Sequence, residues 1–260
     1  MDARTLFRTG FLLLCLLSPN TLVAAQQRFA EPELETAADR SVFNKQVFQQ
    51  SLSGLYSIDS WKSAEIRQPY QTFPPLYHAA RAAQQELDTV LSRIGGQSAT
   101  EPLMGNLKSA HRAQAKIATD LKGDSSRITD LARGSLIAAN VPDLVHAYAL
   151  LGQELTIVSV KNRFKHPAPS GYRDLNVLVR LPQSQLIAEV QLHLAAIAEV
   201  KSGPEHQLYE QIQEIERRGL KADRPLTELE QANIARLRQT SGQLYQAAWQ
   251  QYLQPQTLAG

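Results

Sequence analysis

The chain has 260 residues, of which 43% are hydrophobic, and this is enough apolar material for one substantial domain or for a small domain with a helical extension. Its 27 lysines and arginines nearly balance its 25 aspartates and glutamates. The net charge therefore gives no indication of a long nucleic-acid-binding surface, and any anion site must be local.

Residues 1–25 have the pattern of a secretory signal peptide. Arg4 and Arg8 precede an apolar run at 11–17, and residues 23–25 are small enough for cleavage. The run is well short of the roughly 20 apolar residues that span a bilayer, which argues against a permanent membrane helix. We expect a secreted or periplasmic protein without stable membrane insertion after cleavage. The alternative is a misassigned start, in which the segment is a tail on a cytoplasmic enzyme.

The segment 26–100 is predicted to be an N-terminal helical region. Residues 31–62 indicate only a weak helix and a loop, whereas residues 76–94 carry alanine, leucine and valine at helical spacing. Gly95 and Gly96 are predicted to end this helix. A second helix is predicted over residues 101–121.

The middle of the chain changes to strand patterns. Strands are predicted over residues 128–138, 155–160, 175–181 and 186–192, and a short helix over residues 141–152. A turn-forming tetrapeptide at 182–185 favours an antiparallel hairpin of the last two strands. Residues 195–251 are predicted to be helical with two interruptions. The fold class is therefore α+β, a mixed central sheet of about four or five strands flanked by helices, with helical N- and C-terminal extensions.

Three cations follow helical spacing in the second predicted helix. Lys108, Arg112 and Lys116 are four residues apart, so they lie along one helical face. Like charges at this spacing cost a few tenths of a kcal/mol per pair, which a bound anion such as a triphosphate would offset. The alternative interpretation is a solvated basic face with no ligand.

Alternation along the last predicted strand gathers polar groups on one side. Glu189, Gln191 and His193 share one face, and apolar residues between them point to the other. A carboxylate within so apolar a strand needs a partner or a metal. Asp130, near the first predicted strand, is the second candidate carboxylate. Two carboxylates that converge on Mg²⁺, with lysines for the phosphates, are what phosphoryl or pyrophosphoryl transfer requires.

Three segments, in this order, resemble the RelA/SpoT-type (p)ppGpp synthetases. They are Lys108-Ser109 with Lys116 and Asp130-Leu131-Ala132; residues 161–172, with Lys161, a proline and Gly171-Tyr172; and Glu189-Val190-Gln191-Leu192-His193. The resemblance implies that residues 101–218 form a nucleotidyltransferase-like synthetase domain and that residues 219–260 are a C-terminal helical extension. It also implies transfer of the β,γ-pyrophosphate of ATP to the 3′-hydroxyl of an acceptor nucleotide.

The resemblance assigns a role to each candidate residue. Asp130 and Glu189 are the implied catalytic and Mg²⁺-binding residues, with Glu189 as ligand or as base for the attacking hydroxyl. The candidate nucleotide-binding residues, from the resemblance and from the spacing together, are Lys108, Arg112, Lys116, Lys161, Tyr172, Gln191 and His193; Arg112 and His193 depart from the family pattern. Among them the two lysines before Asp130 hold the ATP phosphates, Lys161 contacts a phosphate, and Tyr172 stacks on the acceptor base.

Departures from the family pattern concern the acceptor and the donor base. Arg133 and Ser135 stand where the family tends to have glycine and arginine. The pattern is closer to secreted or toxin-like members, for which the acceptor is a guanine nucleotide, an adenine nucleotide or the 3′ end of transfer RNA. We therefore expect an exported toxic effector that acts in the cytoplasm of a target cell, with an immunity protein as a further partner. The alternative from another class is a non-catalytic module that binds nucleotides or other anions.

A hydrolase half is not predicted. The hydrolase module of bifunctional relatives uses a His-Asp metal pair, and none of the six histidines in this chain is followed by aspartate. The sequence therefore predicts synthesis without reversal by the same chain.

Overall fold

The structure is a computed structural model that describes residue 46 and residues 49–254, all within one compact unit. The predicted signal peptide at 1–25 lies outside the described residues, so its cleavage stays a prediction. Residues 49–57 are helical. In this described part, every helix is too short or too polar to span a bilayer.

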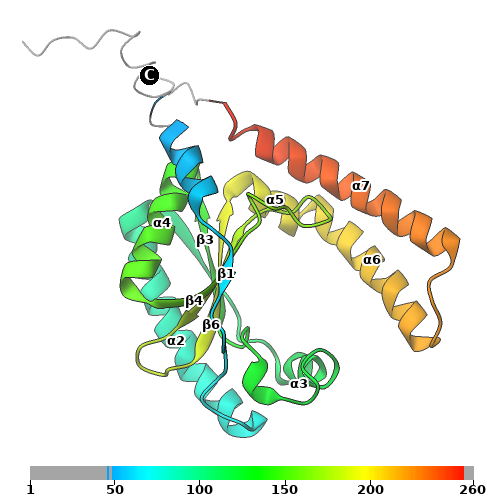
Figure 1. Cartoon of the computed structure of the whole chain (residues 1–260), viewed down its shortest axis with the longest axis horizontal. Helices are drawn as coiled ribbons and strands as arrows, with labels where there is room; N and C mark the ends of the chain where they lie inside the picture. Colours follow the sequence, from blue (N-terminus) through cyan, green and yellow to red (C-terminus); the bar gives the residue numbers. More distant parts are fainter. Residues whose placement is uncertain (1–45, 47–48, 255–260) are drawn as a thin grey trace, which may run out of the picture. The chain divides into compact units, whose positions relative to one another are not determined.

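A mixed sheet forms the centre of the fold (Figure 1). It has six strands in the order β1-β4-β5-β6-β3-β2. Their bounds are Trp61–Lys62 for β1, Thr100–Met104 for β2, Arg133–Ala138 for β3, Thr156–Asn162 for β4, Leu175–Arg180 for β5 and Ile187–Leu194 for β6. β3 and β6 run parallel, and all other neighbours are antiparallel. The predicted α+β class with a mixed sheet and a β5–β6 hairpin is confirmed.

The two additional strands are short edge strands. β1 lies at the end of the segment 31–62, which was predicted as a weak helix and a loop, and β2 comes from the start of the helix predicted over residues 101–121. That prediction was wrong at its beginning, because residues 100–104 pair with β3 along their whole length. The helix α3 spans only Ala110–Thr119, and the hydroxyl of Ser109 caps it by accepting the backbone N–H of Arg112. Lys108 therefore precedes the helix.

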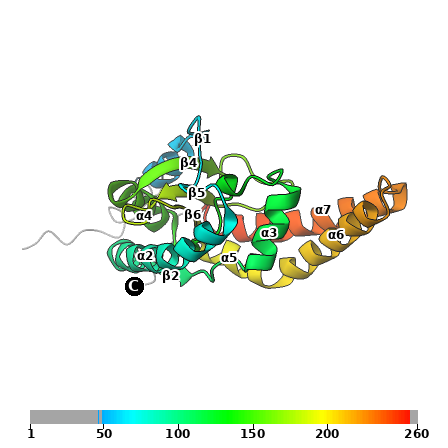
Figure 2. The same cartoon turned by 90° about the horizontal axis from the view of Figure 1, so that it is seen from below.

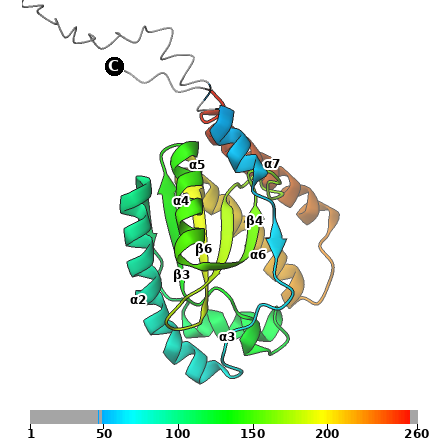
Figure 3. The same ribbon diagram turned by 60° about the vertical axis from the view of Figure 1, so that its left-hand side comes forward.

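Two helices cover one face of the sheet. α2 (Phe73–Ser98) and α4 (Val141–Glu154) lie side by side in Figure 3, and both pack against β3. The approach of α2 is close, because a Cβ atom at Gly134 of β3 would lie 2.4 Å from Leu91 Cδ1 of α2. Gly95 does not end α2 as predicted: it permits contact with β2, where a Cβ would lie 2.8 Å from the Thr100 carbonyl oxygen.

The C-terminal part of the chain is helical, as predicted. α5 (Ala195–Ser202) follows β6 directly, and α6 (Pro204–Lys221) and α7 (Glu228–Gln250) pack against each other (Figure 2). The α6–α7 pair has its own small apolar cluster of Ile212, Ile215, Ile234 and Leu237. The last turns of α7 join the main core through Tyr245 and Trp249. The domain boundaries predicted near residues 100 and 218 stay predictions, and α2 shares the main core with the sheet.

Candidate active site

The sheet face opposite α2 and α4 carries polar side chains in register. Lys161 of β4 pairs with Asn176 of β5, and Asn176 pairs with Gln191 of β6. Directly opposed residues point to the same side of a sheet, and Glu189 and His193 join them because they are two residues from Gln191. The alternation predicted for this strand is therefore present. Lys161 is exposed, and its side chain makes no ion pair or hydrogen bond within the described residues.

Asp130 is buried between two lysines. Its Oδ2 accepts hydrogen bonds from Nζ of Lys108 at 2.8 Å and from Nζ of Lys116 at 2.9 Å. Burial by itself raises the pKa of the Asp130 carboxyl, but the hydrogen bonds and charges of the two lysines outweigh it and lower the pKa below its ordinary value. The other oxygen, Oδ1, is buried with no hydrogen-bond partner within the described residues. One oxygen thus pairs with both cations, and the other is buried without a partner.

The predicted row of three cations is divided in the structure. Lys108 lies before α3 and Lys116 on it, and both reach Asp130. Arg112 is exposed on α3, and its guanidinium has no ion pair in the described part of the chain. The arrangement therefore places two lysines at one carboxylate and leaves the arginine in solvent.

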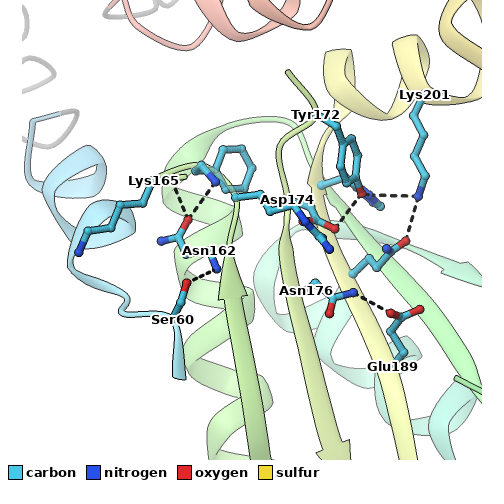
Figure 4. A network of polar contacts seen from close by, with 12 residues as sticks. Ser60, Asn162, Lys165, Tyr172, Asp174, Asn176, Glu189 and Lys201 are labelled. Atoms are coloured by element: carbon cyan, nitrogen blue, oxygen red, sulfur yellow. Dashed lines mark hydrogen bonds and ion pairs between the residues drawn. The ribbon is translucent and has the colours of Figure 1, made fainter. Parts of the chain in front are cut away.

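Glu189 lies at the same end of the sheet as Asp130. Its backbone N–H donates to the carbonyl oxygen of Ala132 at 3.1 Å, two residues beyond Asp130. Its side-chain Oε1 accepts from Nδ2 of Asn176 at 2.8 Å (Figure 4). The amide fixes one carboxylate oxygen on the open face of the sheet.

The donor set fits a magnesium ion completed by substrate. Mg²⁺ in nucleotide sites is bound by one or two carboxylates together with phosphate oxygens and waters. Asp130 Oδ1 and the carboxylate of Glu189 are oxygen donors of this kind. Within residues 49–254 there is no cluster of three or more His, Cys, Asp or Glu side chains that would form a cage from protein groups alone.

A second polar network surrounds Tyr172 (Figure 4). The Tyr172 hydroxyl donates to Oδ2 of Asp174 at 2.7 Å and lies 2.6 Å from Nε2 of His193. Asp174 is fully buried and pairs with Nη1 of Arg163 at 2.6 Å, and burial raises the pKa of its carboxyl. Burial, and then the charges of Lys201 and Arg163, lower the pKa of His193 to about 3. His193 is therefore neutral, and its Nε2 shares a hydrogen bond with the tyrosine hydroxyl that donates to Asp174.

The loop that carries Tyr172 is packed against α7. A Cβ at Gly171, where φ is +80°, would lie 2.9 Å from Cα of Gly242 in α7. The Tyr172 ring lies edge-on to Tyr245 of α7 at a centroid distance of 5.5 Å. In this conformation the Tyr172 hydroxyl is hydrogen-bonded to Asp174 and to His193. His193 is 3% exposed and positions the tyrosine through this hydrogen bond. Base stacking by Tyr172 and nucleotide contact by His193 stay predictions.

The structure places two further cationic side chains at the site, and the sequence analysis did not identify either as a binding residue. Arg133 of β3 pairs in register with Glu189, and both line a cavity of about 330 Å³ that also includes Gln191. Lys201 of α5 donates from Nζ to Oε1 of Gln191 at 2.9 Å. Arg133 was noted only as a departure from a family pattern, and Lys201 has no local sequence signal beyond a lysine in a short helix.

No protein-family model and no curated protein matches the chain. Solved structures do match it, among them the two that follow. The complex of the type VI effector Tas1 with its immunity protein has 21% sequence identity and a TM-score of 0.51, over 68% of this chain and 96% of that chain. Small alarmone synthetase 1 from Bacillus subtilis, bound to its product pppGpp, has 18% identity and a TM-score of 0.50, over 68% of this chain and 94% of that chain. The resemblance to RelA/SpoT-type synthetases is thus confirmed for the fold, and this chain has the fold of the small alarmone synthetases.

Proposed function

We propose that the chain is a nucleotide pyrophosphokinase, which transfers the β,γ-pyrophosphate of ATP to the 3′-hydroxyl of a guanine or adenine nucleotide. The observation that carries this proposal is the Asp130 carboxylate, which binds two lysines through Oδ2 and keeps a buried, unpartnered Oδ1 at the same end of the sheet as Glu189. The shared fold with a synthetase solved with pppGpp supports this assignment.

The donor phosphates belong at Lys108 and Lys116 in this proposal. Asp130 holds both ammonium groups in place before ATP arrives, so their side chains are already ordered. Each can turn a further N–H toward a phosphate oxygen, because an ammonium group has three donors. When bound between Asp130 and Glu189, Mg²⁺ would offset the negative charge of the phosphate oxygens. The exposed cations Arg112 and Lys161 add attraction for the polyphosphate.

Glu189 orients and deprotonates the acceptor hydroxyl in this proposal. Asn176 fixes Oε1, which leaves Oε2 to accept the proton of the 3′-hydroxyl. The 3′-oxygen forms a bond to the β-phosphorus of ATP as the bond between that phosphorus and the α,β-bridging oxygen breaks. AMP leaves with the bridging oxygen, and the acceptor carries the pyrophosphate.

The test is a transfer assay on residues 26–260. ATP labelled at the β-phosphate, Mg²⁺ and one acceptor each of GTP, GDP, ADP, AMP or transfer RNA should give a labelled acceptor and one AMP per transfer. Glu189→Gln is the matched control, because glutamine keeps the oxygen that accepts from Asn176 but cannot take a proton. We expect its rate to fall by about 10²-fold or more. A folded protein that labels no acceptor would contradict the proposal and favour the anion-binding alternative.

We also propose that the chain is exported and acts as a toxic effector, with an immunity protein as its specific inhibitor. The signal-like segment at 1–25 supports export, and the fold shared with Tas1, which was solved with its immunity protein, supports the effector role. ATP is scarce outside cells, so the reaction requires the cytoplasm of a target cell. Cytoplasmic expression of residues 26–260 should arrest growth, whereas the Glu189→Gln variant should not. Mass spectrometry of the secreted N-terminus tests cleavage near residue 25.

A further inference from the structure

Lys201 is a partly buried cation without a carboxylate partner. It projects from the last turn of α5 over the polar sheet face (Figure 4). Its Nζ donates to Gln191 Oε1 at 2.9 Å, lies 3.4 Å from His193 Nε2 and sits 5.5 Å from the centre of the Tyr172 ring. All three neighbours are uncharged. Within the described residues, Lys201 forms no salt bridge.

An unpaired cation in such surroundings costs folding free energy. Burial lowers the pKa of Lys201, while the more distant charges of Asp174 and Glu189 raise it without contact. The lysines at Asp130 differ, because their charges are paired directly. The anionic group of a ligand would pair with the charge of Lys201, as the Asp130 carboxylate pairs with the charges of its two lysines.

The surroundings of Lys201 have room for such an anion. The side chain lines a cavity of about 560 Å³ between α5, the edge strand β2 and its neighbour β3. Ser202 and His206 also line this cavity, as do the carboxylate residues Glu101 and Glu199. Leu103 and Ser135 belong both to this cavity and to the neighbouring one that contains Glu189. The two cavities therefore adjoin where β2 and β3 pair at these two residues.

The site of Lys201 is separate from that of the donor phosphates. β6 rises about 3.3 Å per residue, so the Gln191 position that Lys201 contacts is about 7 Å beyond Glu189. The lysines that hold the donor phosphates contact Asp130, which precedes β3, and β3 runs parallel to β6. Glu189 therefore lies between two cationic sites, as a transferase with two anionic substrates requires.

We propose that Lys201 binds the 5′-phosphate of the acceptor nucleotide. This inference rests on the proposed function, which places the 3′-hydroxyl of that nucleotide at Glu189. The ribose separates the two groups, so the 5′-phosphate extends from Glu189 along β6 toward α5. Gln191 keeps the ammonium group in place by accepting one of its hydrogen bonds.

The experiment compares nucleosides with their 5′-monophosphates by calorimetric titration, with and without a non-hydrolysable ATP analogue. The probes are guanosine and GMP, and adenosine and AMP. The wild-type chain should bind at least one monophosphate about 10- to 100-fold more tightly than its nucleoside, the range of a charge-assisted contact. In Lys201→Gln this ratio should fall to near one, with the affinity for the nucleoside unchanged. Lys201→Arg should keep a ratio well above one.

Lys221 provides the matched control, because it is an exposed lysine in the last turn of α6. Lys221→Gln should keep the wild-type ratio. A Lys201→Gln variant that also keeps it would overturn the inference. The titration measures binding and not pyrophosphate transfer. If the wild-type chain transfers no pyrophosphate but Lys201→Gln still loses the preference for the monophosphate, the phosphate site is present and the proposed function fails. If the wild-type chain transfers pyrophosphate but Lys201→Gln keeps the preference for the monophosphate, the proposed function holds and the inference about Lys201 fails.

A thermal unfolding measurement separates binding from a structural role. Lys201→Met removes an unpaired buried charge and keeps most of the side-chain length, so its melting temperature should equal or exceed that of the wild type. A clearly lower melting temperature would mean that Lys201 supports the fold through Gln191, and would also overturn the inference.

Discussion

The packing of the Tyr172 loop on α7 can be tested at one glycine. Gly171 has φ of +80°, and a Cβ there would lie 2.9 Å from Cα and 3.4 Å from the carbonyl oxygen of Gly242. Gly123 also has φ of +80°, but nothing lies within 4 Å of a Cβ at that position. Alanine at the two sites therefore introduces the same backbone strain, and only at Gly171 does it introduce a collision with backbone atoms.

The two contributions differ in size. Left-handed backbone costs an alanine about 1–2 kcal/mol at either position. The collision at Gly171 cannot be relieved by a side-chain rotation, because its partner is main chain, and overpacking of this kind costs about 1–3 kcal/mol more. We expect Gly123→Ala to lower the free energy of unfolding by about 1–2 kcal/mol and Gly171→Ala by about 2–5 kcal/mol.

Urea unfolding of both variants measures the difference. Trp249 lies on α7 in contact with Phe164 of the same loop, at a ring-centroid distance of 5.4 Å, so tryptophan fluorescence reports on this interface. Circular dichroism gives the global transition. Equal losses in the two variants, within about 0.5 kcal/mol, would refute the close contact between the loop and α7.

Three further predictions concern buried polar groups. Because its folded-state pKa is lowered, Asp130 contributes stability that is fully present above the ordinary carboxyl value of 3.8 and lost as the pH falls through the folded value. Urea unfolding between pH 6 and pH 2 should show a smaller acid-induced loss in Asp130→Asn, and identical profiles would contradict the ion pairs. Tyr172→Phe removes the hydroxyl between Asp174 and His193 and should cost about 1–3 kcal/mol in the same assay, whereas a change near zero would argue against the network. Glu205→Ala removes the acceptor of two buried hydroxyl donors on α7 and should cost about 2–4 kcal/mol; an unchanged melting temperature would count against these bonds.

Most elements away from the sheet edges could be predicted from local sequence patterns. The β5–β6 hairpin followed from two apolar runs around a turn tetrapeptide, and α4 from its proline and aspartate at the start. The polar face of β6 followed from strict alternation, because the side chains of a strand point to opposite faces in turn. These features depend on residues that are close in sequence, so local sequence patterns are sufficient to predict them.

The edge strands could not be predicted in this way. Residues 100–104 include a proline and exposed side chains, and their local preference does not favour a strand. They form β2 because β3 offers them a free edge, and that edge exists only after residues distant in sequence have paired. The same pairing removes Lys108 from the helix and turns it, with Lys116, toward Asp130.

The sequence by itself determined the class of fold, the alternation that sets Glu189 beside Gln191, and the residue types suited to polyphosphate chemistry. Only the tertiary structure decided which of these groups meet: two lysines at Asp130, Tyr172 held between Asp174 and His193, and Lys201 over the polar face without a counter-charge. The reason is that periodicity reports which side of a helix or strand is buried, whereas contacts between segments depend on how the whole sheet pairs and on which helix returns to it.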